Sequence, residues 1–445
     1  MNGVTHLDVA VIGTGYVGTT TSIAFAAWDH KVIAVDSDQM KIARLNQSIL
    51  PFYEEGLERR LERYRESGNL SFTDDLEQGI TRSDVLFIAV GTPSSPDGSA
   101  DLSYVEMVAR QIGQMMDKYK VIVTKSTVPV GTGDKIKSII TDELKRRNLS
   151  FSFDIVSNPE FLREGRALYD ALHPERVVIG CETETARKTM AALYEKVEAP
   201  MLYTTIRDAE MIKYAANAFL ATKISFVNEL ARLCDKMGTN IMKVAEGMGL
   251  DSRIGPQFLR AGIGYGGSCF PKDTAALLNL AKEQETMLPV LQAASNVNRT
   301  QVSWFMERIH HIMGSLAGKK VTLLGLTFKP ETDDVREAPS LKIIEQLLQN
   351  KAIVSTYDPQ GMENVKKIYP QVAYKPTPYE ALEGADAIIL ATEWREILDL
   401  DWTKVKDLIA QPYLFDGRNA LVPSVMRNLG YCYVGVGIDG RGDYH

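Results

Sequence analysis

The chain has 445 residues, 45% of them hydrophobic and 24% charged, and its 57 acidic and 50 basic side chains leave a net charge of −7. This composition excludes an intrinsically disordered chain, and the acidic balance argues against nucleic acid and anionic membranes as partners. No apolar run approaches the ~20 residues that span a bilayer and the first residues lack a signal-peptide pattern, so we expect a cytoplasmic protein of about three domains.

The first part of the chain alternates short β-branched runs with helical patterns. Buried strands are predicted at residues 8–12, 31–35, 85–90, 121–124, 154–156 and 177–179. Helices are predicted between them at residues 40–47, 57–67, 104–116 and 134–148. This β-α-β alternation predicts a parallel sheet with helices on both faces.

The remainder of the chain first turns helical and then returns to strands. Long helices are predicted at residues 208–237, 241–248, 274–282 and 288–313, and strands at 321–324, 353–357, 387–391, 413–415 and 431–436. We therefore expect an α/β fold of two Rossmann-like, doubly wound domains, residues 1–204 and 316–445, joined by a helical connector and dimerisation domain at 205–315. The cleft between the two α/β domains is the expected ligand site.

A glycine-rich turn follows the first predicted strand. Gly13-Thr-Gly15-Tyr-Val-Gly18 leads from that strand into a helix of small residues, and Asp36 ends the next strand. The glycines allow a tight turn and close approach of a pyrophosphate to the helix N-terminus. Because Asp36 would bind the adenosine ribose and repel a 2′-phosphate, the sequence favours NAD over NADP.

Two common routes to hydride chemistry are missing, because the sequence has no Tyr-x-x-x-Lys and no cysteine and histidine spacing suited to zinc. Gly264-Tyr-Gly-Gly-Ser-Cys269-Phe-Pro-Lys-Asp273 is the most informative stretch. Pro271 suits the first turn of a helix, which places Cys269 just before that helix, where the dipole and Lys272 would stabilise a thiolate. We interpret Cys269 as a nucleophile and the other cysteines as packed thiols.

Two further groups of polar residues are candidates for the site. Lys213 and Asn217 are one helical turn apart on the long connector helix. Glu160 and Glu164 follow a strand of the first domain, where ligands of parallel sheets bind. Each group also has an ordinary interpretation, as solvated helix surface and as helix-capping acids.

Together with these residues, a series of ordered motifs resembles bacterial members of the UDP-glucose/GDP-mannose dehydrogenase family over nearly the whole length. The further motifs are Val90-Gly-Thr-Pro93, Lys125-Ser-Thr-Val-Pro-Val-Gly131, Asn158–Gly165, Lys213–Phe219, Asp251-Ser-Arg-Ile-Gly255, Phe328-Lys329 with Arg336, and Asp416-Gly-Arg418. The resemblance implies an NAD-dependent oxidoreductase without a metal, which carries out the four-electron oxidation of UDP-glucose to UDP-glucuronate for polysaccharide biosynthesis.

The resemblance also implies a role for each catalytic residue. Cys269 corresponds to a nucleophile that forms a thiohemiacetal and then a thioester, Lys213 and Asp273 to a polar pair at the sugar C6 oxygen, and Thr127 and Glu160 to groups that handle water. Asn217, with Lys213, would stabilise oxyanion charge. The family members form homodimers or larger homo-oligomers.

The binding residues that the resemblance implies fall into two sets. The cofactor set is Gly13, Gly15, Tyr16, Val17, Gly18, Asp36, Lys41, Thr92, Pro93, Thr127, Glu164, Lys272 and Arg336. The substrate set is Glu160, Phe161, Leu162, Arg163, Glu164, Lys213, Asn217, Arg253, Phe258, Arg260, Gly266, Phe328, Lys329 and Arg418. Within it, Lys329 and Arg418 would hold the UDP, and Arg253 would be contributed across a dimer interface.

Three alternatives stay open. A related nucleotide sugar, GDP-mannose or a UDP-N-acetyl-hexosamine, could be the substrate, although Phe270 after the cysteine and Ser268 before it favour UDP-glucose. A two-electron hydroxy-acid dehydrogenase shares the first domain and a Lys/Asn pair but needs no Cys269. A catalytically dead nucleotide-sugar sensor would be expected to lose Cys269, Lys213 or Asp273, and all three are present.

Overall fold

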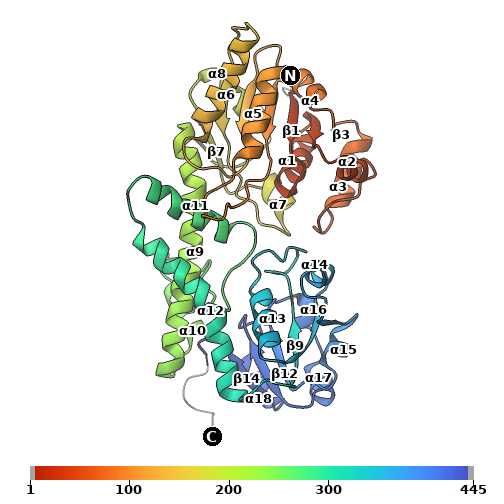
Figure 1. Ribbon diagram of the computed structural model, residues 1–445, viewed down its shortest axis with the longest axis vertical. Coiled ribbons are helices and arrows are strands. Elements are labelled where there is room, and N and C mark those ends of the chain that lie inside the picture. The colour runs from red at the N-terminus through yellow and green to blue at the C-terminus, as the bar shows by residue number, and fades with distance from the viewer. Residues whose placement is uncertain (1–5, 439–445) are drawn as a thin grey trace. The chain divides into compact units, whose positions relative to one another are not determined.

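The computed structural model describes residues 6–438 of the chain. The described residues divide into two compact units, and the boundary falls between residues 216 and 217, within helix α9 (Ile206–Met237). In each unit, helices pack against a central sheet (Figure 1).

The sheet of the first unit has eight strands in the described residues, in the order β3-β2-β1-β4-β5-β6-β7-β8. The strands are β1 (Asp8–Ile12), β2 (Lys31–Val35), β3 (Leu70–Thr73), β4 (Val85–Ile88), β5 (Val121–Thr124), β6 (Asp154–Ser157), β7 (Val177–Cys181) and β8 (Met201–Thr204). The helices that connect them are α1 (Tyr16–Ala27), α2 (Gln39–Leu45), α3 (Leu57–Glu66), α4 (Leu76–Arg82), α5 (Ser103–Met115), α6 (Thr132–Arg146), α7 (Ala167–Leu172) and α8 (Glu184–Leu193).

The second unit contains the greater part of α9 and a second sheet, whose order in the described residues is β11-β10-β9-β12-β13-β14. Its strands, all parallel, are β9 (Lys320–Leu324), β10 (Ile353–Tyr357), β11 (Ala373–Tyr374), β12 (Ala387–Leu390), β13 (Tyr413–Asp416) and β14 (Cys432–Gly435). The further helices are α10 (Ile241–Gly249), α11 (Phe270–Glu283), α12 (Pro289–Met313), α13 (Pro339–Gln349), α14 (Met362–Lys366), α15 (Pro378–Leu382), α16 (Arg395–Leu398), α17 (Trp402–Leu408) and α18 (Pro423–Asn428).

Strands buried on both faces explain the continuous apolar runs in the sequence. In β1, Val9 and Val11 join the apolar cluster on one side of the sheet, and Ala10 and Ile12 join the cluster on the other. Strand β12 alternates in the same way between the two clusters of its own sheet. Such strands need helices over both faces, which is the predicted doubly wound arrangement.

The expected α/β fold, with two Rossmann-like domains joined by a long helix, is confirmed, and each predicted strand is present with its ends shifted by at most two residues. Strands β3, β8 and β11 were not predicted, because these short segments lack a distinct β-branched run. The expectation of a fully parallel first sheet is wrong for one pair. Strand β7 runs antiparallel to β6: the connection between them contains only the short α7 and returns at the same end of the sheet instead of crossing it.

The same glycine turn follows the first strand of each sheet. Gly13 and Gly325 follow the first strands of their sheets with φ of +102° and +89°, and their N–H groups donate to the last carbonyl of the neighbouring strand, at Val35 and Tyr357. Asp36 accepts the N–H of Thr14, and Asp358 accepts those of Leu326 and Thr327. The same glycine turn and the same aspartate contact are therefore built in both sheets.

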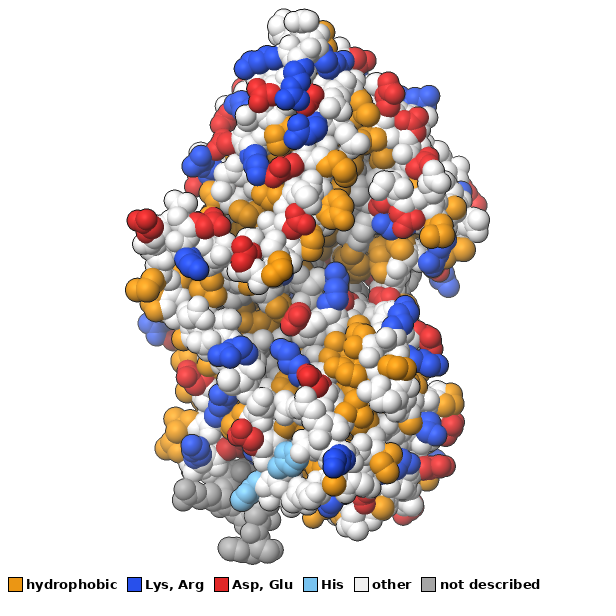
Figure 2. Space-filling model, viewed as in Figure 1, with side chains coloured by type: hydrophobic (Ala, Val, Ile, Leu, Met, Phe, Trp, Pro, Cys, Tyr) orange, Lys and Arg blue, Asp and Glu red, His pale blue; other side chains and the backbone are white. Residues whose placement is uncertain are grey.

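The surface bears charges of both signs. On the face that Figure 2 shows, Lys and Arg are intermixed with Asp and Glu among the described side chains in view, with no broad area of a single sign. Within the described residues, no helix combines the length and the apolar character that crossing a bilayer requires.

Candidate active site

The turn after β1 is shaped to receive an anion. A Cβ added at Gly13 would lie 2.6 Å from the Ala89 carbonyl oxygen, and one at Gly18 would lie 1.8 Å from the Gly13 oxygen, so both positions require glycine for packing. A Cβ at Gly15 would meet nothing within 4 Å. Gly15 is the N-cap of α1 and has no capping side chain, which leaves open space in front of the first N–H groups of α1. A pyrophosphate fits this position.

Asp36 and Lys41 form an ion pair beside this turn. The Asp36 Oδ2 atom accepts from the Lys41 Nζ at 2.9 Å and from the Thr14 N–H at 2.9 Å, and Oδ1 accepts from the Asp38 N–H. Burial alone would raise the pKa of Asp36, but these hydrogen bonds together hold it below its usual value. The carboxylate is therefore ionised and fixed in orientation at the end of β2.

Tyr16, predicted as a cofactor residue together with Val17, also links two distant loops. Its hydroxyl donates to Glu54 and accepts the Gly165 N–H, and its ring packs on Phe52 with centroids 4.6 Å apart. Burial raises the pKa of Tyr16, and the hydrogen bond to Glu54 raises it further. Glu54 in turn accepts the N–H groups of Ala167 and Leu168. The cofactor turn is thus tied to the loop that follows β6.

Further predicted cofactor residues follow β4 and β5. The Thr92 hydroxyl donates to the Thr127 carbonyl at 2.8 Å, which holds these two loops together, and Pro93 is exposed. Glu164 lies in the loop after β6, in the same unit. Arg336 lies in the second unit, where its guanidinium is paired with Asp334.

Glu160 and Lys213 form a buried ion pair in the first unit. The Lys213 Nζ donates to Glu160 Oε1 at 2.9 Å, and the Leu162 N–H donates to Oε2 at 2.6 Å. The side chains are 7% and 4% exposed. Burial would raise the pKa of Glu160, but the charge and hydrogen bond of Lys213, helped by Leu162 and by the charge of Lys125, hold it below its usual value. An ionised carboxylate with both oxygens held is positioned to accept a proton from water.

The loop around this pair contains two arginine contacts. The Arg176 guanidinium lies over the Phe161 ring at 3.9 Å from the centroid, and the Lys213 Nζ lies 5.5 Å from the same centroid. Arg163, expected to bind substrate, makes a two-pronged bond to Asp170 through Nε and Nη2. Sequence reasoning missed Arg176, because nothing in its local pattern distinguishes it from a surface cation.

A carboxylate on α9, Glu210, holds the loop that contains Thr127. Glu210 is buried and accepts the N–H groups of Gly131 and Gly133, at 2.7 and 2.8 Å. Burial raises the pKa of Glu210 to about 7, in spite of these two bonds. Glu210 precedes Lys213 by about one turn of α9 and so anchors the start of that helix to the N-terminus of α6.

Cys269 is the N-cap of α11, with Pro271 in the first turn, as the sequence predicts. Asp273 is buried, and its Oδ2 accepts from the Asn217 Nδ2 at 2.6 Å. The Lys272 Nζ donates to Asp273 Oδ1 at 2.7 Å. Its charge is therefore paired with this carboxylate, whereas the sequence predicts that it stabilises the Cys269 thiolate. The structure therefore brings Asn217 and Asp273 together within one turn of Cys269.

Three amide side chains hold the glycine loop before Cys269. The Asn228 Oδ1 accepts the Gly262 N–H, the Gln301 Nε2 donates to the Gly262 carbonyl, and Asn298 both accepts from and donates to the Tyr265 backbone. Asn228 and Gln301 are fully buried. These amides were not predicted, because the sequence alone does not distinguish a buried amide on a helix from an exposed one. They fix the backbone that leads to Cys269.

Arg418, one of the two cations expected to hold the UDP, is hydrogen-bonded within the second unit. The Arg418 guanidinium donates to the carbonyls of Ala391, Gly264 and Phe328, at 2.6, 3.0 and 3.1 Å. Burial lowers the pKa of Arg418, and the Glu393 charge opposes that change. Arg418 thus joins the Cys269 loop to two loops of the second sheet through three of its five N–H groups, and its Nε also lies 3.5 Å from the Glu393 carboxylate.

The other substrate candidates of this unit are spread over several loops. Lys329 Nζ lies 5.7 Å from the Phe328 ring centroid, Arg260 donates to the Asn419 carbonyl, and the largely exposed Arg253 pairs with Asp251. Phe258 has φ of +64°, a left-handed conformation that is uncommon for an aromatic residue. A Cβ at Gly266 would lie 2.2 Å from the Glu337 oxygen, so this loop is packed against the loop before α13.

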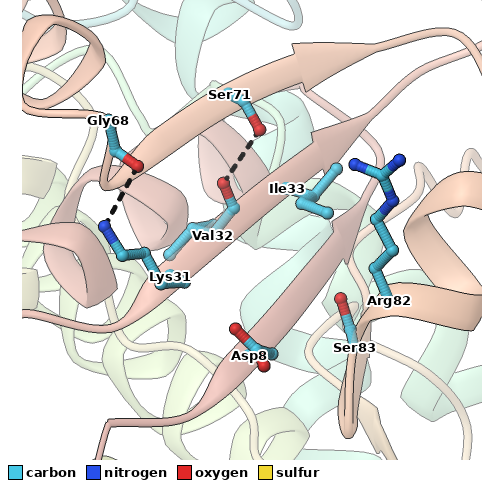
Figure 3. Close-up of a pocket in the computed structure, with 8 residues that line it drawn as sticks. All are labelled: Asp8, Lys31, Val32, Ile33, Gly68, Ser71, Arg82 and Ser83. Carbon is cyan, nitrogen blue, oxygen red and sulfur yellow. Dashed lines mark hydrogen bonds between the residues drawn. The ribbon is translucent and has the colours of Figure 1, made fainter.

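A shallow pocket lies elsewhere, at the amino ends of the strands of the first sheet (Figure 3). Asp8, Lys31, Arg82 and Ser83 are among its lining residues, and Lys31 donates there to the Gly68 carbonyl. Ligands of open parallel sheets bind at the carboxyl ends of the strands, where Gly13, Thr92 and Glu160 lie. The pocket is therefore distinct from the candidate site.

Comparisons with known proteins agree with this geometry. Sequence models of the UDP-glucose/GDP-mannose dehydrogenase family match the chain with the NAD binding domain at residues 7–198, the central domain at 207–300 and the UDP binding domain at 322–423. Two similar proteins are the UDP-glucose 6-dehydrogenase TuaD of Bacillus subtilis, 46% identical over 96% of this chain and 93% of its own, and the UDP-glucose 6-dehydrogenase of Rhizobium meliloti, 43% identical over 97% and 99%.

A solved structure is similar over almost the full length. The UDP-glucose dehydrogenase of the archaeon Pyrobaculum islandicum superposes with a TM-score of 0.91 at 37% identity, over 98% of this chain and 99% of that one. These matches confirm the expected oxidoreductase class and the expected NAD-binding domain. The chain belongs to the UDP-glucose/GDP-mannose dehydrogenase family.

Proposed function

We propose that this chain oxidises UDP-glucose to UDP-glucuronate with NAD, in two successive two-electron steps at the sugar C6. The observation that carries the proposal is the placement of Cys269 at the N-terminus of α11, one turn from the buried Asn217–Asp273 pair. A helix N-terminus stabilises a thiolate, and a buried amide and carboxylate beside it suit an oxygen substituent on the carbon that the sulfur attacks.

The residues of the first unit suit NAD. Gly15 leaves room for the pyrophosphate at the α1 N-terminus, and the ionised Asp36 would accept the ribose hydroxyls. When bound, NAD accepts the hydride that leaves C6 in each oxidation. The division into residues 1–204, 205–315 and 316–445, with NAD held by the first domain and UDP by the last, is part of the proposal.

The protein side chains stabilise charge on the C6 oxygen, add the sulfur nucleophile and remove a proton from water. Lys213 and Asn217 stabilise negative charge on the C6 oxygen, and the Cys269 thiolate adds to the aldehyde to form a thiohemiacetal. Oxidation of this thiohemiacetal, the second of the two oxidations, leaves a thioester on Cys269. Glu160, assisted by Thr127, takes a proton from water, the hydroxide adds to the thioester carbonyl and displaces the Cys269 thiolate, and UDP-glucuronate is released.

The substrate and assembly are inferred from related observations. Both curated relatives above are named UDP-glucose 6-dehydrogenases, and Phe270 follows the nucleophile as expected for that substrate. Phe219, Phe226 and Leu233, spaced by seven residues along α9, are 66%, 48% and 51% exposed, which forms an apolar stripe that a second copy would cover in a homodimer. Four cysteines without a disulfide suit the reducing cytoplasm.

The test compares wild type with Glu160→Gln and Cys269→Ala. Wild type should form two NADH per UDP-glucose. Glu160→Gln should give a burst approaching two NADH per active site followed by a stall, with a uronyl adduct on Cys269 found by mass spectrometry, because neither hydride transfer needs that base. Cys269→Ala should show no adduct and no second oxidation. One NADH per sugar with free aldehyde would instead identify a two-electron enzyme.

A further inference from the structure

Two buried lysines lie at opposite ends of β5. Lys120 precedes the strand and is fully buried, and its Nζ donates to the Ser83 carbonyl at 2.7 Å. Lys125 follows the strand, at the carboxyl ends of the strands where the candidate site lies, and is 8% exposed. Lysine is seldom buried, so each needs a reason. Lys120 satisfies a backbone carbonyl and pairs with Asp117 at 3.7 Å, whereas Lys125 contacts neutral side chains.

Lys125 lies in a buried polar network between three elements. Its Nζ donates to Asn158 Oδ1 at 3.0 Å and approaches the Tyr194 hydroxyl at 3.4 Å. Tyr194 donates to the same Asn158 oxygen at 2.6 Å, and Asn158 Nδ2 donates to the Val178 carbonyl at 2.8 Å. The network therefore fixes Asn158, which precedes Glu160 by two residues in the same loop.

The charges in this cluster do not balance in pairs. Glu160 is bonded to Lys213, yet Lys125 also lies close enough for its charge to act on Glu160 and on Lys213. The charged and titratable groups that face Lys125 from the neighbouring elements are Glu160, Lys213 and Tyr194. The Glu160 carboxylate is thus bonded to one buried ammonium group and acted on by the charge of a second, an arrangement that favours its ionised form.

We propose that Lys125 is a positioning residue, which orients the Asn158–Glu160 loop and holds a positive charge beside Glu160 for thioester hydrolysis. This inference rests on the proposed function, because it assigns Lys125 to the base of that reaction. Burial lowers the pKa of Lys125 to about 8, so its charge is present at neutral pH and lost above about 8. Its contribution to Glu160 therefore depends on pH.

The experiment compares Lys125→Met with the matched control Lys120→Met, in which a buried lysine is removed from the other end of the same strand. For both variants and wild type, kcat is measured from pH 6 to pH 9, together with the thermal midpoint. We expect kcat of Lys125→Met to be about tenfold below wild type at pH 6, where both the positive charge and the hydrogen bond to Asn158 are lost. The loss should be smaller at pH 9, where wild-type Lys125 is neutral but still donates to Asn158. At pH 6, mass spectrometry should find the Cys269 adduct accumulating.

Lys120→Met should follow the wild-type pH profile, whatever stability it loses. A pH-independent loss in Lys125→Met, or the same profile for both variants, would overturn the proposal. If Lys125→Met does not fold, Lys125→Gln, which can still donate to Asn158, takes its place with the same expected profile. A wild type that forms only one NADH per sugar refutes the proposed function itself, whereas two NADH with an unchanged Lys125 profile refutes only the role of Lys125.

Discussion

Gly15→Ala separates cofactor binding from folding. Gly15 has φ of −70° and ψ of −168°, a conformation that alanine adopts without strain, and its added Cβ would meet no atom within 4 Å. The methyl group would instead occupy the space in front of the α1 N-terminus, where we place the pyrophosphate. The substitution should leave the fold intact and weaken NAD binding.

The two neighbouring glycines provide the contrast. Gly13 has φ of +102°, and its Cβ would lie 2.6 Å from a carbonyl oxygen, so alanine there costs the left-handed strain of about 1–2 kcal/mol and a clash in addition. At Gly18 the added Cβ would lie 1.8 Å from the Gly13 oxygen, which forces the helix away from the turn. At Gly15, alanine should stabilise the fold by about 0.4–1 kcal/mol, because it restricts the unfolded chain.

The assay measures two quantities for the three variants: the thermal midpoint without ligand, and the NAD dissociation constant by calorimetric titration. We expect Gly15→Ala to melt at or slightly above the wild-type temperature and to bind NAD at least tenfold more weakly, a loss of about 1.4 kcal/mol. Gly13→Ala and Gly18→Ala should both melt well below wild type. If Gly15→Ala retains wild-type affinity, the pyrophosphate does not sit at the α1 N-terminus and the cofactor assignment of this turn is wrong.

Three further results are expected. Asp36→Ala should narrow the preference for NAD over NADP by about tenfold or more in kcat/KM, because it removes the carboxylate and releases Lys41 to meet a 2′-phosphate; a wild type that uses both cofactors equally would contradict this role of Asp36. Glu210→Gln should alter the pH dependence of stability. Because the folded pKa of Glu210 is raised from 4.5 to about 7, the wild type loses ~3 kcal/mol of unfolding free energy as the pH rises from 4.5 through 7, and the variant does not. Thermal midpoints at pH 5 and pH 8 measure this difference, and an equal fall in both proteins would show that the assignment is wrong. Phe226→Asp, in the middle of the apolar stripe on α9, should convert a dimer to a monomer in sedimentation, and an unchanged dimer would place the interface elsewhere.

Much of the site is encoded in short stretches of sequence. The turn at Gly13–Gly18, the Asp36 after the second strand and the Cys269 at a helix start with Pro271 were all predicted, and the structure has each in that local setting. They could be predicted because each depends on a few adjacent residues: a glycine conformation, a helix cap or a strand period. The alternation of buried strands and helices determined the doubly wound fold in the same way.

Tertiary structure alone decided the partners of the charged side chains. Arg418 is bonded to carbonyls of three loops, one of them 154 residues away in the chain, and Lys125 to Asn158 and Tyr194, 33 and 69 residues away. From the sequence, Arg418 is only a cation for UDP, and Lys125 is only the first residue of a motif. The reversed strand β7 could not be predicted either. Which ions are paired and which strand turns back depend on packing between distant segments, and local propensity carries no information about that packing.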